Sequence, residues 1–192
     1  MDVMCLEYTL LRPPKPDKKL PKSVNLKNLR TLARPNSDCQ FGYRTSIYKE
    51  NIQEEFITEV KIKFVRGERK EINQAICEKI AYRQVHQPLE LPSIGSTFKN
   101  VNLNDVPNEF REMFCDKIKN DPFPIIPAAV FLSESGLKGK KVGKIEISSK
   151  HPNFFVNIGG GTSGEVEESI SFAKEAVKKK FNIDLETEII KL

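Results

Sequence analysis

A hydroxyl and an amine lie close together on a segment that prolines keep out of regular structure. Residues 87–100 read Gln-Pro-Leu-Glu-Leu-Pro-Ser-Ile-Gly-Ser-Thr-Phe-Lys-Asn. The prolines withhold amide donors and favour extended backbone, and Gly95 permits a backbone conformation or close approach that a side chain would disfavour. Ser96 could donate a proton or a hydrogen bond, and Lys99 could attract an anionic substrate. The alternative, from residue types alone, is an ordinary surface turn, because serine and glycine are common turn residues.

An arginine in a second segment offers a different chemistry. Residues 38–48 read Asp-Cys-Gln-Phe-Gly-Tyr-Arg-Thr-Ser-Ile-Tyr. Arg44 can donate two parallel hydrogen bonds to a carboxylate, which a lysine cannot do in the same geometry. On these residues alone, the simpler interpretation is a turn around Gly42 with an exposed arginine.

These segments resemble the active-site sequences of the UDP-N-acetylenolpyruvoylglucosamine reductase family. Four blocks match in the same order along more than half of the chain, which carries more weight than any single match. The blocks are Arg83 with Gln87-Pro88 and Pro92-Ser93-x-Gly95-Ser96-x-Phe98-Lys99, then Gly136-Leu137-Lys138-Gly139, then Ser149 to Phe154, then Leu185-Glu186-x-Glu188. The arginine segment also falls on a family motif, with Cys39, Phe41, Tyr43, Arg44 and Ser46 at the matching positions.

The resemblance implies roles for seven residues. Arg44 and Glu188 would stabilise the carbanion that forms after hydride addition, with the glutamate protonated, and Ser96 would donate the proton. The implied substrate contacts are Tyr43, His86, Lys99 and Asn153. His86 stands where several members of the family carry lysine. No residue of the chain is assigned to cofactor binding.

The activity that the resemblance implies is that of a cytoplasmic flavoenzyme. FAD, reduced by NADPH, would serve to reduce UDP-N-acetylenolpyruvoylglucosamine to UDP-N-acetylmuramate in peptidoglycan precursor synthesis. Members of the family begin with a domain that carries a glycine-rich flavin pyrophosphate loop, and no such loop occurs in these 192 residues. We therefore expect this chain by itself to bind FAD weakly or not at all. It would be either a fragment of a longer product or a truncated homologue that needs a separate flavin-binding partner, the missing flavin-binding half.

Two classes of function stay open on this basis. One is the reductase, and the other is a truncated or degenerate UDP-sugar-binding module without redox activity of its own. Arg44, Ser96 and Glu188 together favour the reductase, because a module that only binds has no chemical need for all three.

Composition indicates a globular protein and excludes several partners. The chain is 39% hydrophobic and 30% charged, with a net charge of +5, which suits anionic ligands. Aromatic and basic residues are not interleaved, so we expect no nucleic-acid partner. The four cysteines form no CxxC pair and there are only two histidines, so we expect no metal site. With no secretory start and no apolar run of about 20 residues, we expect a cytoplasmic protein without membrane contact, and a monomer.

The expected fold class is α+β. By resemblance, residues 1–70 would be part of a FAD-binding domain of the vanillyl-alcohol-oxidase type, and residues 71–192 an α+β substrate-binding domain. Apolar spacing and caps predict the elements. Strands are expected at 1–11, 56–64, 142–147, 153–158 and 185–190. Helices are expected at 26–33 and 69–83, within an insertion at 102–126, after Pro127, and at 162–181.

Two of the helices have a regular apolar stripe. In the helix at 69–83 the stripe consists of Ile72, Ala75, Ile76 and Ile80. In the last helix a buried stripe is expected, made of Val166, Ile170, Ala173, Val177 and Phe181. The strand at 185–190 would place Glu186 and Glu188 on the face opposite Leu185 and Ile189.

Overall fold

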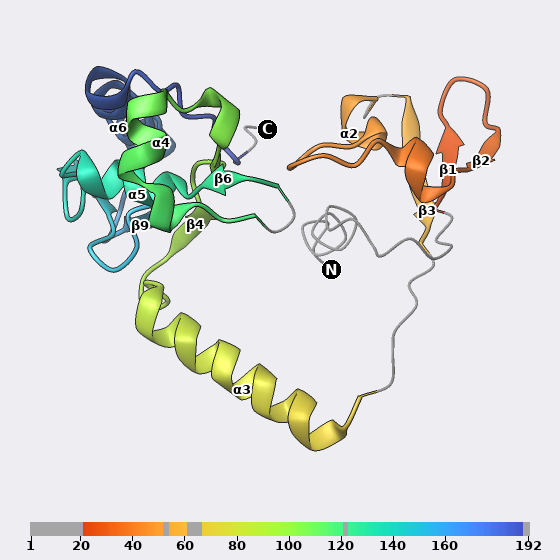
Figure 1. Ribbon diagram of the computed structural model, residues 1–192, viewed down its shortest axis with the longest axis horizontal. Coiled ribbons are helices and arrows are strands. Elements are labelled where there is room, and N and C mark those ends of the chain that lie inside the picture. The colour runs from red at the N-terminus through yellow and green to blue at the C-terminus, as the bar shows by residue number, and fades with distance from the viewer. Residues whose placement is uncertain (1–20, 52–53, 61–66, 121–122, 190–192) are drawn as a thin grey trace. The chain divides into compact units, whose positions relative to one another are not determined.

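The computed structural model describes residues 21–51, 54–60, 67–120 and 123–189. The chain divides into two compact units, residues 1–67 and 68–192, hereafter unit 1 and unit 2. Both units are visible in Figure 1, where unit 1 is orange and unit 2 runs from yellow to blue. The chain contains separate helices and antiparallel strands, in agreement with the expected α+β class. The strand expected at 1–11 lies outside the described residues, as does the second half of the strand expected at 56–64.

Unit 1 is a small antiparallel sheet with the strand order β2-β1-β3. Ser23 in the central strand pairs with Leu32 on one side and Ile57 on the other. The elements are β1 (Lys22–Asn25), β2 (Thr31–Ala33), the 3₁₀ helix η1 (Asn36–Cys39), α2 (Ile47–Glu50) and β3 (Glu55–Glu59).

The helix predicted at 26–33 is wrong, because this segment is the turn and second strand of a hairpin. The Asn25 side chain accepts hydrogen bonds from the amides of Lys27 at 3.0 Å and Asn28 at 3.2 Å. Leu29 then adopts a left-handed conformation with φ of 57°. Bonds of this kind between an asparagine and the nearby main chain offer the backbone an alternative to a helix. The helical spacing of the leucines was therefore misleading.

A buried ion pair links the strands in the described part of unit 1. Among the described residues of the unit, the buried hydrophobic side chains are those of Cys39 and Tyr48. Both terminal nitrogens of Arg34 donate to the carboxylate of Glu55, one of them at 2.5 Å, and the Ser23 hydroxyl donates to the same carboxylate. The guanidinium also lies 5.5 Å from the centre of the Tyr48 ring. The Glu55 side chain is only 7% exposed, and the hydrogen bonds from Arg34 hold its pKa below the usual range.

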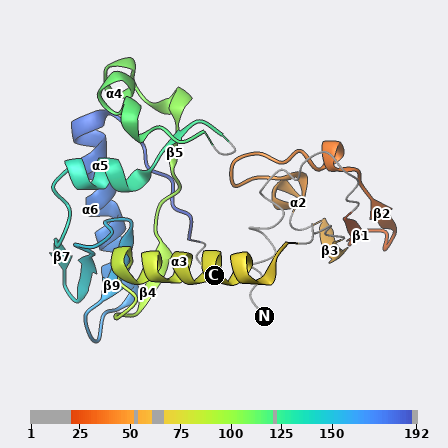
Figure 2. The same ribbon diagram turned by 60° about the horizontal axis from the view of Figure 1, so that its bottom comes forward.

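Unit 2 is built on a four-stranded antiparallel sheet with the order β4-β9-β8-β7, and on a second pair, β5-β6. Figure 2 shows α5 and α6 side by side, and α6 packs against β7 and β8. The helices are α3 (Arg69–His86), α4 (Asn108–Met113), α5 (Ala128–Glu134) and α6 (Ser163–Phe181), with 3₁₀ helices η2 (Leu103–Asp105) and η3 (Cys115–Lys117). The strands are β4 (Ser93–Ser96), β5 (Val101–Asn102), β6 (Ile125–Ile126), β7 (Lys141–Val142), β8 (Ile145–Ile147) and β9 (Phe154–Asn157).

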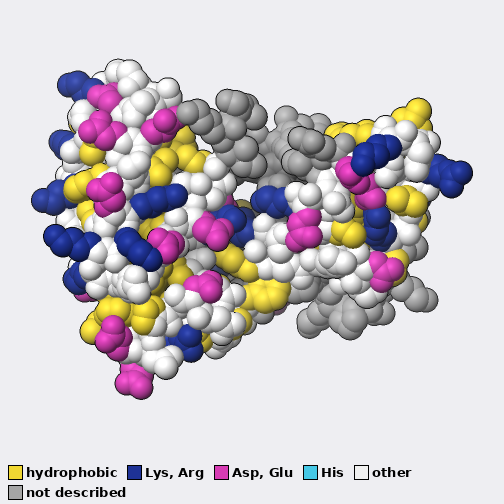
Figure 3. All heavy atoms as spheres, turned by 90° about the horizontal axis from the view of Figure 1, so that it is seen from above, with side chains coloured by type: hydrophobic (Ala, Val, Ile, Leu, Met, Phe, Trp, Pro, Cys, Tyr) yellow, Lys and Arg dark blue, Asp and Glu magenta, His cyan; other side chains and the backbone are white. Residues whose placement is uncertain are grey.

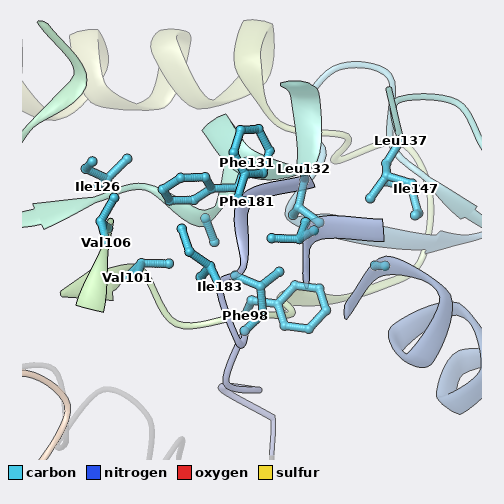
Figure 4. Packing of buried hydrophobic residues seen from close by; sticks show 14 of the residues in the cluster. Phe98, Val101, Val106, Ile126, Phe131, Leu132, Leu137, Ile147, Phe181 and Ile183 are labelled. Carbon is cyan, nitrogen blue, oxygen red and sulfur yellow. The ribbon is translucent and has the colours of Figure 1, made fainter. Parts of the chain in front are cut away.

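One hydrophobic core fills unit 2 (Figure 4). Phe131 of α5 meets Phe181 of α6 edge to face, with ring centres 5.4 Å apart. Phe98, which follows β4, is 1% exposed and meets Phe155 of β9 in the same manner at 5.8 Å. Aromatic pairs in this geometry contribute about 1 kcal/mol beyond the area that they bury. Phe98 therefore anchors the segment after Ser96 in the core.

The predictions for the two core helices are confirmed. Thr162 caps α6, its hydroxyl accepts from the Glu165 amide, and the Glu165 carboxylate accepts from the Thr162 amide. On the predicted stripe, Ala173, Val177 and Phe181 are buried, and Val166 and Ile170 pack against the core. Pro127 precedes α5, as expected, and the buried residues of α5 are Ala128, Phe131 and Leu132.

One strand prediction is wrong and one helix prediction is confirmed. The single strand predicted at 142–147 is a hairpin, β7–β8, with Gly143 at φ of 54° in its turn. The helix expected within 102–126 is α4, which ends at Met113, a residue that is 62% exposed.

Helix α3 is present but none of its residues is buried. The predicted stripe is open to solvent, with Ile72, Ile76 and Ile80 each about half exposed, at 47%, 50% and 51%. Figure 1 shows the helix extending away from the other elements of unit 2. Within the described ranges, no helix combines the length and the apolar character needed to cross a membrane.

Neighbouring glutamates allow the ion pair of unit 1 to be tested. Glu55→Gln should destabilise unit 1 by about 2 kcal/mol at pH 7, because it removes a buried partner of a charged hydrogen-bonding group. Among the residues that the structure describes, Glu54 pairs with the exposed Lys27, so Glu54→Gln, the matched control, should cost less than about 0.5 kcal/mol. Hydrogen exchange of the amides in β1 and β3 measures both.

The effect of Glu55→Gln should depend on pH in one direction. Because the folded pKa of Glu55 is lowered, its contribution is present above the unfolded value of about 4.3 and is lost as the pH falls through the folded value. Wild type and variant should therefore converge in acid. Equal exchange rates at pH 7 would contradict this account of unit 1.

Candidate active site

The structure places Ser96 at the end of β4, where it pairs with Phe154 of β9. The register of the two strands shifts between Ser93 and Ser96, and Gly95 has φ of 78° within this irregularity. A Cβ atom on Gly95 would have no atom within 4 Å, so the backbone conformation, and not crowding, favours glycine here. Ser96 is half-buried, and its hydroxyl has no hydrogen-bond partner among the described residues. It is therefore available to a ligand.

The C-terminal segment brings Glu188 to the same strand. The Glu188 amide donates to the Thr97 carbonyl at 2.9 Å, and the Lys99 amide donates to the Glu186 carbonyl at 2.8 Å. The strand predicted at 185–190 appears here as an extended segment with one bridge, between Phe98 and Thr187. Glu188 consequently lies opposite Thr97, the residue that follows Ser96.

Lys99 and Glu186 form an ion pair where segment Ser96–Lys99 meets segment Glu186–Glu188, a place hereafter called the junction. Lys99 Nζ lies 2.8 Å from a Glu186 carboxylate oxygen, and the Glu186 side chain is 74% exposed. The hydrogen bond and charge of Lys99 lower the pKa of Glu186. Exposed pairs of this kind contribute little to stability, so the ammonium can exchange this carboxylate for an anionic ligand at small cost.

Asn153 is buried and hydrogen-bonded to the main chain. Its side-chain oxygen accepts from the Phe98 amide and its side-chain nitrogen donates to the Phe98 carbonyl, both at 2.9 Å. Its own carbonyl accepts from the Thr97 amide at 2.8 Å. The side chain expected to contact substrate thus has both of its polar atoms directed at Phe98.

His86 is the last residue of α3 and is exposed. Its Nδ1 atom lies 2.8 Å from the Tyr82 carbonyl oxygen, and its ring stacks on the Tyr82 ring with centres 4.0 Å apart. The contacts that the structure describes for His86 are therefore within its own helix, and not with the Ser96 strand.

Tyr43 and Arg44 belong to unit 1, whereas the other predicted site residues belong to unit 2. They form the tip of a turn in which the Gly42 amide donates to the Thr45 carbonyl at 3.0 Å and the reverse bond is 3.4 Å. Arg44 has φ of 58°, a left-handed conformation that costs a residue other than glycine about 1 kcal/mol or more. The turn expected around Gly42 is present, but Arg44 is half-buried instead of exposed.

Sequence reasoning missed two residues at this junction. Thr97 is fully buried and its hydroxyl has no hydrogen-bond partner among the described residues. The pairing of Glu186 with Lys99 was also missed, although opposite charges on two extended segments are a usable signal for cross-strand pairing.

Acidic and basic side chains are mixed on the visible surface in Figure 3. Near the Ser149 to Phe154 block, burial lowers the pKa of His151, and the charges of Lys119 and Lys138 lower it further. Burial therefore favours the neutral form of its imidazole.

Taken together, these contacts define a class of site. One edge of the α+β unit 2 carries three groups. They are the Ser96 hydroxyl, which has no hydrogen-bond partner among the described residues, the Lys99 ammonium, which can leave Glu186 for a ligand, and the extended segment that contains Glu188. Such a site suits an anionic ligand that receives a proton.

Comparison with known sequences gives the family. Residues 87–192 match the family described as UDP-N-acetylenolpyruvoylglucosamine reductase, C-terminal domain. The chain belongs to the UDP-N-acetylenolpyruvoylglucosamine reductase family.

Among its relatives is the reductase of Fervidobacterium nodosum, 34% identical over 153 residues, which cover 80% of this chain and 42% of the relative. The reductase of Clostridium tetani is 33% identical over 171 residues, which cover 89% of this chain and 46% of the relative. The chain thus spans less than half the length of these relatives.

The crystal structure of UDP-N-acetylenolpyruvylglucosamine reductase from Thermus caldophilus has a similar fold. The TM-score is 0.60 at 23% identity, and the match covers 90% of this chain and 52% of the other.

The conformation of Gly95 can be tested against a matched glycine. Gly139 also has a left-handed backbone, with φ of 72°, and space for a Cβ atom, but it lies in a different turn. Alanine at either position should cost about 1 kcal/mol of stability. Only Gly95→Ala should shift the amide NMR signals of Ser96 and Glu188. Unchanged signals at these two residues would show that Gly95 does not set the position of the Ser96 strand.

Proposed function

We propose that this chain is the substrate-binding part of an NADPH-dependent, FAD-mediated reductase. The reaction is the reduction of UDP-N-acetylenolpyruvoylglucosamine to UDP-N-acetylmuramate, in cytoplasmic peptidoglycan precursor synthesis. The observation that carries the proposal is the pairing of Thr97 and Lys99 with Glu188 and Glu186, beside the Ser96 hydroxyl. Membership of the reductase family supports the substrate class.

Reduction of the enolpyruvyl ether makes three demands on the protein. Negative charge that develops beside the substrate carboxylate must be stabilised, a proton must be donated to that carbon, and water must be excluded. Ser96 is the proposed proton donor. A serine is a weak acid, but a carbanion is a strong enough base to take its proton within hydrogen-bond reach. Glu188 in its protonated form and Arg44 are the proposed stabilisers of the charge.

The substrate is also an anion through its nucleotide. Lys99 is the proposed contact for this part, since its ammonium can leave Glu186 for a phosphate oxygen. Tyr43 and His86 stay predicted substrate contacts, on the resemblance alone.

FAD reduced by NADPH supplies the hydride when it is bound. The chain lacks the glycine-rich loop that would cradle the flavin pyrophosphate, so we assign this site to polypeptide outside these 192 residues. The coverage of the relatives supports that assignment, because the chain spans 42% and 46% of the two relatives described above.

Replacement of Ser96 separates catalysis from binding. In the chain completed with the flavin-binding half of a relative, Ser96→Ala should leave the reduction of FAD by NADPH nearly unchanged, because that half-reaction does not use the serine. Oxidation of the reduced flavin by the enolpyruvyl substrate should fall by about 100- to 10,000-fold, the usual contribution of a general acid. Stopped-flow absorbance of the flavin measures both half-reactions.

Ser96→Cys is the matched variant, because a thiol can donate a proton from nearly the same position. Its rate of flavin oxidation by substrate should fall less than that of Ser96→Ala. A lost hydroxyl contact in substrate binding costs about 1 kcal/mol, or several-fold. A slowing of less than tenfold, with affinity reduced equally, would therefore demote Ser96 to a binding residue. Tight substrate binding without any turnover would favour the UDP-sugar-binding module instead.

A further inference from the structure

The main chain of Phe98 is hydrogen-bonded to a side chain where a sheet would normally provide a strand. On one side, Thr97 and Lys99 pair with the C-terminal segment through Glu188 and Glu186. On the other side, both main-chain polar groups of Phe98 are bonded to the Asn153 amide at 2.9 Å. These two bonds have the donor and acceptor pattern of a neighbouring strand residue.

We infer that Asn153 is a positioning residue, whose amide substitutes for a strand and holds the Ser96–Lys99 segment in place. The roles of Ser96 as proton donor and of Lys99 as anion contact rest on the proposed function, but the positioning of the segment by Asn153 does not. The inference gives Asn153 a different role from the substrate contact that the resemblance implies. Each polar atom of this side chain already makes a bond to Phe98, and the residue is only 4% exposed, which leaves little access for substrate.

The chemistry of the position requires an amide. Phe98 presents one donor and one acceptor, and Asn153 is only 4% exposed, so water cannot replace a missing bond there. A side chain that both accepts and donates satisfies the two groups together. An ionised aspartate accepts only, and it would face the Phe98 carbonyl with a negative charge. An apolar residue would leave two buried main-chain groups unpaired.

Main-chain bonds fix the position of Asn153 in the sheet. It directly precedes β9, and the first residue of β9, Phe154, pairs with Ser96. The Asn153 carbonyl accepts from the Thr97 amide at 2.8 Å. The residue therefore bonds to two successive residues between Ser96 and Lys99. A change in its side chain should move the proposed proton donor and the proposed anion contact together.

Asn157, at the other end of β9, provides a matched control. Its side-chain oxygen accepts from the amides of Gly159 at 2.9 Å and Gly161 at 3.0 Å. Its side-chain nitrogen donates only one longer bond, of 3.3 Å, to the Gly161 carbonyl. An ionised aspartate can make both of the shorter bonds. The same substitution is therefore tolerable at Asn157 and unfavourable at Asn153.

The test compares Asn153→Asp with Asn157→Asp in the whole chain as a function of pH. A neutral carboxylic acid can donate and accept, so at Asn153 the protonated aspartate restores both bonds to Phe98. Its folded pKa is raised above the unfolded value of about 3.9, so the penalty is absent in acid and grows as the pH rises. At Asn157 two amides favour the ionised form, so this variant should lose stability in acid relative to wild type.

Hydrogen exchange at the amides of Phe98 and Glu188 gives the readout. At pH 7.5, Asn153→Asp should lose protection by roughly 10- to 100-fold, and near pH 4.5 it should approach wild type measured at the same pH. Asn157→Asp should keep wild-type protection at both residues at pH 7.5. Wild-type protection of Asn153→Asp at pH 7.5, or a loss that acid does not reverse, would overturn the inference. If Asn153→Asp is unfolded at pH 7.5, refolding near pH 4.5 supports the inference, and failure to refold there overturns it.

Affinity for UDP-N-acetylenolpyruvoylglucosamine, measured by calorimetry, separates positioning from direct contact. The affinity of Asn153→Asp should be weak at pH 7.5 and recover in acid together with the Phe98 amide. A loss of affinity with normal Phe98 protection would mean that Asn153 contacts substrate directly, which overturns the inference. If wild type does not bind this substrate, the proposed function fails, and amide exchange still decides the role of Asn153.

Discussion

The hydrogen-bonding requirement of the short stretch Thr97 to Lys99, in which Thr97 and Phe98 are buried, organises the described part of unit 2. Buried main-chain donors and acceptors must be paired, or each costs the free energy of a lost hydrogen bond. The C-terminal segment pairs with one side of this stretch and Asn153 with the other. The Phe98 side chain fixes the stretch in the core, where it packs against Phe155. Segments distant in sequence are thereby tied to one strand, and the candidate chemical groups lie at its ends.

Different interactions lie in the interiors of unit 1 and unit 2. Unit 2 has an aromatic and aliphatic core in which Phe131 and Phe181 meet (Figure 4). In the described part of unit 1, the Arg34–Glu55 ion pair lies between the strands instead. Ion pairs of this kind stabilise weakly in net terms but are costly to break.

Local signals in the sequence were sufficient for some elements and not for others. The capping box of α6 and the proline before α5 are read within a few residues, and both helices were predicted correctly. At 26–33 the leucine spacing favours a helix, but the Asn25 side chain accepts from the main chain that follows it and stabilises the turn of a hairpin.

Other features depend on contacts that no local pattern reveals. The apolar row of α3 was predicted, but periodicity shows which face of a helix is apolar and not what covers it. For Asn153, resemblance suggested a ligand contact. Its partners are main-chain atoms of a residue far away in the sequence, and only the three-dimensional structure reveals them.

The central claim is that substrate binds at the junction of Ser96–Lys99 with Glu186–Glu188. It is tested most directly by following amide and side-chain NMR signals of the chain while UDP-N-acetylenolpyruvoylglucosamine is added. The account predicts saturable shifts concentrated on these two segments, with the Lys99 ammonium signal changing as it leaves Glu186. Binding that perturbs the Gly159–Gly161 loop but leaves both segments unchanged, or no binding at all, would contradict it.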